Sequence, residues 1–338
     1  MTIPTMLYGE NRWQKPVTYN TNDSTHPLAI SRFEYIVGGG LGGVNVTDFN
    51  RLLHTVTHIA AAFHVNYGEQ EIPPVIAIGV KHGNACGAAI GSDVEETLRR
   101  MISGDPEAIL GGVVLSTVPI NLVGANIFAE KGVLGGVLAP AFEAGAAERF
   151  NRKDGKCHVM RNPALRSVTK DSIDTTPIKY PLFGGEYFTQ PNFTFVLNLG
   201  DNLIERHGVS SPINFSEQDM LLARAIGSTS NSNTITIVKN GMLLGNGVGQ
   251  QTRVRACKLA VDIAREGGHD IDGAVAYSDS FFPFPDGPKI LADAGVKAIL
   301  STSGARQDAA VIKFCKMREV ALYLIPDNIG RGFFGHAV

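Results

Sequence analysis

Short apolar runs of strand length alternate with amphipathic stretches along most of this 338-residue chain. Residues 74–80 are almost continuously apolar, as expected of a strand buried on both faces of a sheet. Residues 44–65 instead repeat their apolar side chains at helical spacing. Further strand-like runs follow at 112–117, 135–140, 273–276, 296–300 and 320–325. This alternation predicts an α/β fold in which helices are layered on a mixed sheet.

The alternating apolar pattern occurs in two separate parts of the chain, which predicts two halves. Its length suggests about two domains at roughly 150 residues each. The periodicity fails after residue 162, where Pro, Thr, Asp and Gly accumulate. We therefore predict a first unit over 1–165, a connection over 166–192 and a second unit over 193–338. In the second unit, Asn240-Gly241 between two apolar runs predicts a β-hairpin.

The two halves echo one another weakly. A buried strand leads into residues 81–87 in the first half, and another leads into residues 278–284 in the second. A helix and a further strand follow each of them. Two related α/β units would place chemistry between them. The alternative is that any two α/β halves resemble each other to this degree.

Charge and hydropathy narrow the class of ligand. The chain has 30 Lys and Arg against 32 Asp and Glu, a net charge of −2, which argues against nucleic-acid binding. No apolar run reaches the roughly 20 residues of a membrane span. Residues 1–10 lack the profile of a signal peptide. We expect a cytoplasmic protein that binds small molecules, with neither nucleic-acid nor membrane partners.

Lys81 and His82 form the first candidate site, because they directly follow the apolar run. Burial and mutual repulsion would disfavour their charged forms, which suits groups that move protons near neutral pH. Asn84 adds a neutral donor and acceptor, and Gly83 lets the backbone turn sharply. The alternative for the dipeptide alone is a salt-bridged lysine and a core histidine at the end of a strand.

A glycine-rich segment, 245–253, lies between a predicted strand and a predicted helix. Its backbone N–H groups and the helix N-terminus can hold an anion, to which Arg253 adds a charged fork. The third glycine comes one residue too early for a dinucleotide-binding fingerprint. An anion or substrate loop and a plain strand-to-helix turn both remain open.

An aromatic segment ends in a carboxylate at Asp286. Phe281, Phe282 and Phe284 surround Pro283, an arrangement that suits a flat heterocycle whose edge is bound by the carboxylate. Core packing is the alternative for these rings.

Metal ligands are not evident in the sequence. His54 and His58 share a helix face, but the H-E-x-x-H pattern is missing, and a polar helix face explains them better. The four cysteines lie far apart without a C-x-x-C pair, which argues against a zinc site and a disulfide framework.

These motifs occur together in one order along residues 8–336. The order is Tyr8-Gly9-Glu10-Asn11, Lys81-His82-x-Asn84-x-Cys86-Gly87, Ser232-Asn233, Gly247-x-Gly249-Gln250-Gln251-x-Arg253, Ser278-Asp279-x-Phe281-Phe282-Pro283-Phe284-x-Asp286 and Arg331. The combination resembles the AICAR transformylase domain of the bifunctional purine enzyme that also carries IMP cyclohydrolase. The cyclohydrolase domain would precede Tyr8, so we expect a free-standing transformylase.

The resemblance implies a fold and a reaction. The fold is a pair of tandem cytidine-deaminase-like three-layer α/β units with mixed sheets and no zinc. The reaction is formyl transfer from 10-formyltetrahydrofolate, a co-substrate, to the 5-amino group of AICAR in purine biosynthesis, with no metal required. The family forms homodimers with active sites at the interface, so a homodimer is expected here.

The resemblance also assigns roles to residues. The catalytic set would be His82 as proton acceptor, Lys81 as stabiliser of the oxyanion or proton donor to the folate nitrogen, and Asn233 as the group that orients the carboxamide and formyl oxygen. The substrate-binding set would be Tyr8, Gly111, Arg253, Arg331 and Phe281. The folate end of the pocket would be lined by Phe284 and Asp286, besides Phe281.

Departures from the family pattern lie mainly in the first motif. Leu7 stands where the family usually has an arginine, and Arg12-Trp13 follow Asn11 where it has Pro-His. We hypothesise that Arg12 supplies the lost charge. Ala85 replaces a proline. These changes leave open a shifted substrate or a non-catalytic nucleotide- or folate-binding protein. A deaminase-like enzyme is opposed by the missing zinc ligands.

Overall fold

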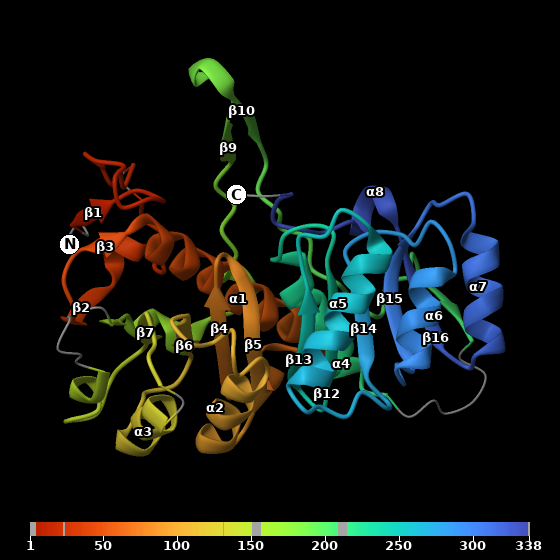
Figure 1. Cartoon of the computed structure of the whole chain (residues 1–338), viewed down its shortest axis with the longest axis horizontal. Helices are drawn as coiled ribbons and strands as arrows, with labels where there is room; N and C mark the ends of the chain where they lie inside the picture. Colours follow the sequence, from red (N-terminus) through yellow and green to blue (C-terminus); the bar gives the residue numbers. More distant parts are fainter. Residues whose placement is uncertain (1–4, 23, 131, 151–156, 209–214, 337–338) are drawn as a thin grey trace.

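A computed structural model describes residues 5–22, 24–130, 132–150, 157–208 and 215–336. A 12-stranded mixed sheet runs through the molecule with helices packed against it (Figure 1), which confirms the predicted α/β class. In spatial order the strands are β11 (Glu205–His207), β16 (Ala321–Pro326), β15 (Ala298–Ser303), β14 (Val275–Ser278), β12 (Ile235–Lys239), β13 (Met242–Gly247), β5 (Asn84–Gly91), β4 (Val75–Lys81), β6 (Val113–Ser116), β7 (Gly136–Ala139), β8 (His158–Arg161) and β2 (Glu34–Val37).

The sheet contains the same arrangement twice. The order β5-β4-β6-β7-β8 in the first half matches β13-β12-β14-β15-β16 in the second. In each half an antiparallel hairpin is followed by a third antiparallel strand and then by two parallel strands. Both hairpins carry a bulge three residues after the turn, at Cys86 and at Leu244. The two arrangements meet where β13 pairs with β5, at Met242 and Ala89.

This topology corrects the echo expected from the sequence. The strand that leads into residue 81 is β4, and its counterpart is β12. The strand that leads into residue 278 is β14, whose counterpart is β6. The sequence echo therefore paired strands that are not equivalent, because similar apolar runs do not reveal the order of strands in a sheet.

Helices cover both faces of the sheet. The α-helices in the described residues are α1 (Gly43–Tyr67), α2 (Val94–Ser103), α3 (Leu122–Glu130), α4 (Glu217–Ser228), α5 (Arg253–Glu266), α6 (Asp286–Asp293), α7 (Asp308–Met317) and α8 (Asp327–Gly330). The long helix α1 packs against α4, and buried residues of both halves form one shared core beneath them. Two separate cores lie on the other face, one under α2 and α3 and one under α5, α6 and α7.

Strand β4 shows why the run at 74–80 is apolar throughout. Ile76, Ile78 and Val80 belong to the core under α1 and α4, whereas Ala77 belongs to the core under α2 and α3. Successive side chains point to opposite faces of a strand, so a strand covered on both faces needs apolar residues at every position.

The predicted hairpin at Asn240-Gly241 is confirmed as the turn between β12 and β13. Both turn residues have positive φ, +53° at Asn240 and +71° at Gly241. A two-residue turn of this kind matches the twist of the strands that it joins, and Asn-Gly adopts it readily.

A two-stranded ribbon projects from the connection between the halves. It consists of β9 (Ile178–Pro181) and β10 (Tyr187–Gln190), which pair with each other and stand away from the large sheet (Figure 1). Its large apolar side chains are exposed at Leu182, Phe183, Tyr187 and Phe188.

Candidate active site

One edge of the sheet gathers the motif residues of both halves. The turn after β4 lies at the start of β5, and antiparallel pairing brings this end of β5 beside the end of β13. The same pairing rule places the start of β12 and the ends of β14, β15 and β16 at this edge. The Lys81-His82 turn, the segment before β12 and the segments after β14 and β16 therefore share one edge.

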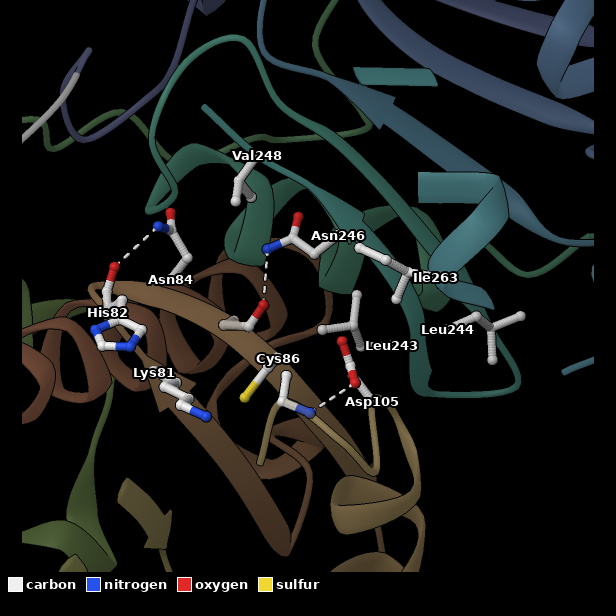
Figure 2. A pocket seen from close by; sticks show the side chains of 13 residues that line it. Lys81, His82, Asn84, Cys86, Asp105, Leu243, Leu244, Asn246, Val248 and Ile263 are labelled. Carbon is white, nitrogen blue, oxygen red and sulfur yellow. Dashed lines mark hydrogen bonds between the residues drawn. The ribbon is translucent and has the colours of Figure 1, made fainter. Parts of the chain in front are cut away.

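A cavity of about 390 Å³ opens between the two hairpins (Figure 2). The first half contributes Lys81, His82, Asn84, Ala85, Cys86, Asp105 and Ala108 to its walls, and the second half contributes Leu243, Leu244, Gly245, Asn246, Val248 and Ile263. One wall is thus polar and the other largely apolar. A cavity of this size and composition suits part of a small organic ligand.

Lys81 is half-buried and donates from Nζ to the carbonyl oxygen of Leu110 at 2.7 Å. The next residue, Gly111, has φ +78°, which favours glycine. The structure therefore places Gly111 beside Lys81, as a combined site requires, although Gly111 is not part of the cavity wall.

His82 is exposed, contrary to the expectation that it is held out of water. The apolar run ends at Val80, and His82 occupies the turn beyond it, with φ +51°. A turn between antiparallel strands at a sheet edge projects past the covering helices, so the apolar run does not extend its burial to the turn.

Asn84 connects the two halves. Its Nδ2 donates to the carbonyl of His82 at 3.1 Å (Figure 2), and its Oδ1 accepts the backbone N–H of Asn231 at 2.9 Å. Across the same junction, Nδ2 of Asn246 donates to the carbonyl of Ala85 at 3.0 Å. These amide bonds fix the polar turn of the first half against the second half.

Asn233 lies in the segment tied down by Asn84, but outside the cavity wall. It is half-buried, and its Nδ2 donates to the carbonyl of Gln250 at 2.6 Å. The backbone groups of Asn233 and Gln250 also bond to each other, at 3.2 Å in each direction. The structure therefore brings Asn233 to the same edge as Lys81 and His82 and directs its side chain toward the glycine-rich loop.

Some backbone N–H groups of the glycine-rich loop are already bonded to other residues of the protein. The N–H of Gly249 donates to the carbonyl of Asn231 at 2.9 Å, and the N–H of Gln250 donates to Asn233. Thr252 caps α5 by accepting the N–H of Arg255. These bonds favour a loop that supports residues 231–233 over an open anion cradle.

Arg253 is the first residue of α5 and forms a buried ion pair with Asp279. Burial lowers the pKa of Arg253 to about 10. Arg331 pairs with Asp327 at 2.8 Å and lies 5.6 Å from the ring centre of Phe281. Both arginines are therefore oriented by carboxylates.

The aromatic motif divides between core and surface. Phe282 is buried in the core under α5, α6 and α7. Phe281 is half-buried beneath Arg331, whereas Phe284 is 57% exposed. Asp286 is exposed at the start of α6, where its Oδ1 accepts the N–H of Gly287 at 2.9 Å. Core packing thus accounts for Phe282, and the other two rings stay available to a ligand as predicted from the sequence.

Tyr8 lies in β1 (Met6–Tyr8), which pairs with β3 (Leu41–Gly42) at the start of α1. A Cβ placed on Gly42 would collide with the Tyr8 ring, so the ring covers this glycine. The guanidinium of Arg12 lies 5.9 Å from the same ring centre. Tyr8 and Arg12 are therefore close to each other, and neither belongs to the cavity wall.

Arg51 was not singled out from the sequence, although it joins the parts of this edge. It is buried and donates to the carbonyl of Thr229 and, at 3.2 Å, to Oδ1 of Asn231. It also lies 3.6 Å from the ring centre of Phe334. Burial lowers its pKa to about 9. The available signal was a charged residue on the apolar side of a helical pattern.

Cys86 lines the cavity next to Lys81. Burial raises the pKa of its thiol to about 12, which keeps it protonated and unreactive as a nucleophile. No disulfide joins Cys86 to the other cysteines. Over the described ranges, no three His, Cys, Asp or Glu side chains are grouped to hold a metal ion. Nor is any helix there long and apolar enough to cross a bilayer.

Fold and site together define a two-unit α/β protein whose basic and amide side chains meet between the units. The chain belongs to the AICARFT/IMPCHase bienzyme family, whose sequence model matches residues 2–263. The family resemblance stated from the motifs is therefore confirmed.

Curated relatives match almost the whole chain. The bifunctional purine biosynthesis protein PurH of Chlorobium phaeobacteroides is 30% identical over 327 residues, covering 94% of this chain and 57% of the relative. The protein of the same name from Thermotoga maritima is 29% identical over 331 residues, covering 96% of this chain and 63% of the relative. The chain thus spans about three fifths of the length of these relatives.

Proposed function

We propose that this protein transfers the formyl group of 10-formyltetrahydrofolate to the 5-amino group of AICAR, yielding FAICAR for purine biosynthesis. The observation that carries this proposal is the meeting of Lys81, His82 and Asn84 with the second half at one cavity. Membership of the family and the names of the relatives, as purine biosynthesis proteins, support it.

The reaction needs proton removal and charge stabilisation together. The amine is a poor nucleophile, because its electron pair is delocalised into the ring and carboxamide. As the amine nitrogen bonds to the formyl carbon, His82 accepts the amine proton. The bond from the formyl carbon to the folate nitrogen N10 then breaks, and N10 takes up the proton that His82 accepted, which returns His82 to its neutral form. Formyl and proton are both accounted for without an oxidant.

Lys81 has the features of an oxyanion stabiliser. Its ammonium is bound to a neutral carbonyl, so its positive charge is not cancelled by that partner. A negative oxygen that develops on the formyl carbon would attract this ammonium strongly in a half-buried site. Asn233 would orient the carboxamide and formyl oxygen by exchanging its bond to Gln250.

The remaining residues divide between the two substrates. Arg253, Arg331, Tyr8 and the backbone at Gly111 would hold the ribonucleotide, with Phe281 stacked on its ring. Phe284 and Asp286 would bind the folate, with the exposed ring covering its heterocycle and the carboxylate bonding to its edge.

We include a homodimer in the proposal. The ribbon formed by β9 and β10 exposes Phe183 completely, and an isolated two-stranded ribbon is marginally stable in water. The ribbon begins near the candidate site. Tyr180 of β9 donates to the backbone carbonyl of Phe334, and the ring of Phe334 lies against Arg51. We therefore expect a second copy of the chain to cover the exposed apolar side chains of the ribbon, close to the cavity. Sedimentation should show a dimer that Phe183→Ser weakens, whereas a monomeric wild type contradicts this arrangement.

We also propose a related fold family and a cellular location for this protein. The duplicated strand order supports the assignment of two tandem cytidine-deaminase-like units. We also propose a cytoplasmic location, in line with the purine biosynthesis role named for the relatives.

The first test mixes the purified protein, AICAR and 10-formyltetrahydrofolate and follows tetrahydrofolate release by absorbance. We expect turnover by the wild type and its loss in His82→Ala, by about 100-fold or more, with nucleotide binding retained. Asn240→Ala is the matched control, because Asn240 has the corresponding position and nearly the same φ in the other hairpin. It should stay within about twofold of the wild type.

Two outcomes would contradict the proposal. A wild type that binds AICAR but releases no tetrahydrofolate at micromolar enzyme indicates a non-catalytic nucleotide-binding protein, an alternative favoured by Leu7 in place of the family arginine. Near-normal turnover in His82→Ala would instead remove His82 from its assigned role.

A further inference from the structure

The two hairpin turns have almost the same backbone. His82 and Gly83 have φ values of +51° and +71°, and Asn240 and Gly241 have +53° and +71°. A lysine precedes each turn, and a bulge follows each at the same distance. The same hairpin conformation therefore occurs twice in the chain. Its first turn position is a histidine in the first half and an asparagine in the second half.

A buried carboxylate lies under each turn. Asp48 of α1 accepts the N–H of Gly83 at 2.6 Å, and the backbone of His82 also faces its carboxylate. Asp219 of α4 accepts the N–H of Asn240 at 2.7 Å and that of Gly241 at 2.5 Å. Both carboxylates are nearly inaccessible, at 3% and 4% exposure. The helices α1 and α4 thus hold the two turns in the same way.

The two turns do not depend equally on this support. Asn-Gly is a preferred sequence for a turn with two positive φ angles, because the short amide side chain bonds locally. His-Gly is not a preferred pair of this kind, and a non-glycine residue in the left-handed region carries a steric cost. We therefore expect the His82 conformation to depend more on Asp48 than the Asn240 conformation depends on Asp219.

We propose that Asp48 is a positioning residue that sets the place of the His82 imidazole at the mouth of the cavity. Its carboxylate holds the backbone of His82 and Gly83 from below, so that the ring extends into the space where the substrate amine is to be deprotonated. Asp48 itself is not among the residues that line the cavity. This role rests on the proposed formyl transfer and adds a residue to it.

The test compares Asp48→Asn with Asp219→Asn. An asparagine keeps the shape but offers one oxygen to two N–H donors, so each variant should loosen its own turn. We expect similar losses of thermal stability in both. Asp48→Asn should lower kcat by about tenfold or more, with KM for AICAR changed by less than about threefold. Asp219→Asn should keep kcat within about twofold. Equal loss of kcat in both variants, or wild-type kcat in Asp48→Asn, overturns the proposal.

Hydrogen exchange separates this claim from the formyl-transfer proposal. Exchange at the amides of His82 and Gly83 should accelerate in Asp48→Asn and stay unchanged in Asp219→Asn, with the reverse at Asn240 and Gly241. A wild type without formyl-transfer activity contradicts the proposed function, whereas unchanged exchange at His82 in Asp48→Asn contradicts the positioning role.

If Asp48→Asn does not fold, Asp48→Glu takes its place in the kinetic test. Glutamate retains the carboxylate but displaces it by one methylene, which shifts the turn. Wild-type kcat in Asp48→Glu overturns the proposal, and a selective fall in kcat supports it.

Discussion

The lysines that precede the two hairpin turns have different partners. Lys239 forms an ion pair with Asp270, with Nζ and Oδ2 2.7 Å apart. Lys81 bonds instead to a neutral backbone carbonyl at the same distance. The corresponding segments before β14 and β6 both contain a glycine with positive φ, Gly273 and Gly111, so the local backbone is alike. One turn thus neutralises its cation, and the other keeps the charge available.

This difference shows how one of two similar hairpins can present a charged lysine while the other holds its lysine in an ion pair. Asp270 lies three residues before Gly273. The residue three positions before Gly111 is Ala108, so the first half has an alanine where the second half has the carboxylate. We infer that this one difference determines which lysine is held in an ion pair with the neighbouring segment.

The largest effect is expected from removing the unneutralised charge. Lys81→Met should lower kcat by about 100- to 1,000-fold, since an oxyanion would then lose its nearest ammonium. Lys239→Met, the matched control, should leave kcat within about twofold and change stability little, because its partner Asp270 is largely exposed. Steady-state kinetics and thermal melts of both variants check this contrast. Similar kcat values in the two variants would show that the turns are functionally alike.

Converting the first turn to the pattern of the second should have a smaller effect. Ala108→Asp places a carboxylate in the cavity wall near Lys81, where it would neutralise the ammonium. We expect kcat to fall by about tenfold or more. Ala108→Asn has nearly the same size without the charge, and the difference in kcat between the two variants measures the electrostatic part. If both variants lose activity equally, crowding rather than charge is responsible.

Acid should destabilise the helix under the first turn selectively. Burial lowers the pKa of His54 to about 3 and of His58 to about 4, both in α1. The unfolded chain therefore binds more protons as pH falls below about 6.5, and each buried histidine removes up to about 1.4 kcal/mol of stability per pH unit down to its folded pKa. Buried Asp48 and Asp219 have raised pKa values and act in the opposite direction, similarly in both halves.

Denaturation midpoints between pH 7 and pH 4.5 measure this effect. His58→Gln should reduce the acid-induced loss of stability, and His207→Gln is the control, because this histidine of edge strand β11 is only half-buried and lies beside Glu205. The same slope in wild type and His58→Gln would exclude His58 as a cause.

Part of the site could be predicted because it depends on short stretches of sequence. The apolar run of β4 indicates a doubly covered strand, so the polar residues directly after it must lie at a sheet edge. The motif order then identified the family. The exposure of His82 could not be derived in this way, because burial of a turn depends on whether helices extend past the sheet. Likewise, Phe282 and Phe284 are close in sequence, and only packing assigns one to the core and the other to the surface.

Local sequence by itself determined the α/β class, the Asn240-Gly241 hairpin and the family, since strand length, turn chemistry and motif order are properties of neighbouring residues. Tertiary structure decided that the two halves form one sheet, which strands correspond, and that Asp48, Arg51 and Asn231 support the candidate site. The physical reason is distance along the chain. Arg51 and Asn231 interact across 180 residues, and such contacts follow from the packing of α1 against α4 and of β5 against β13, which no local pattern specifies.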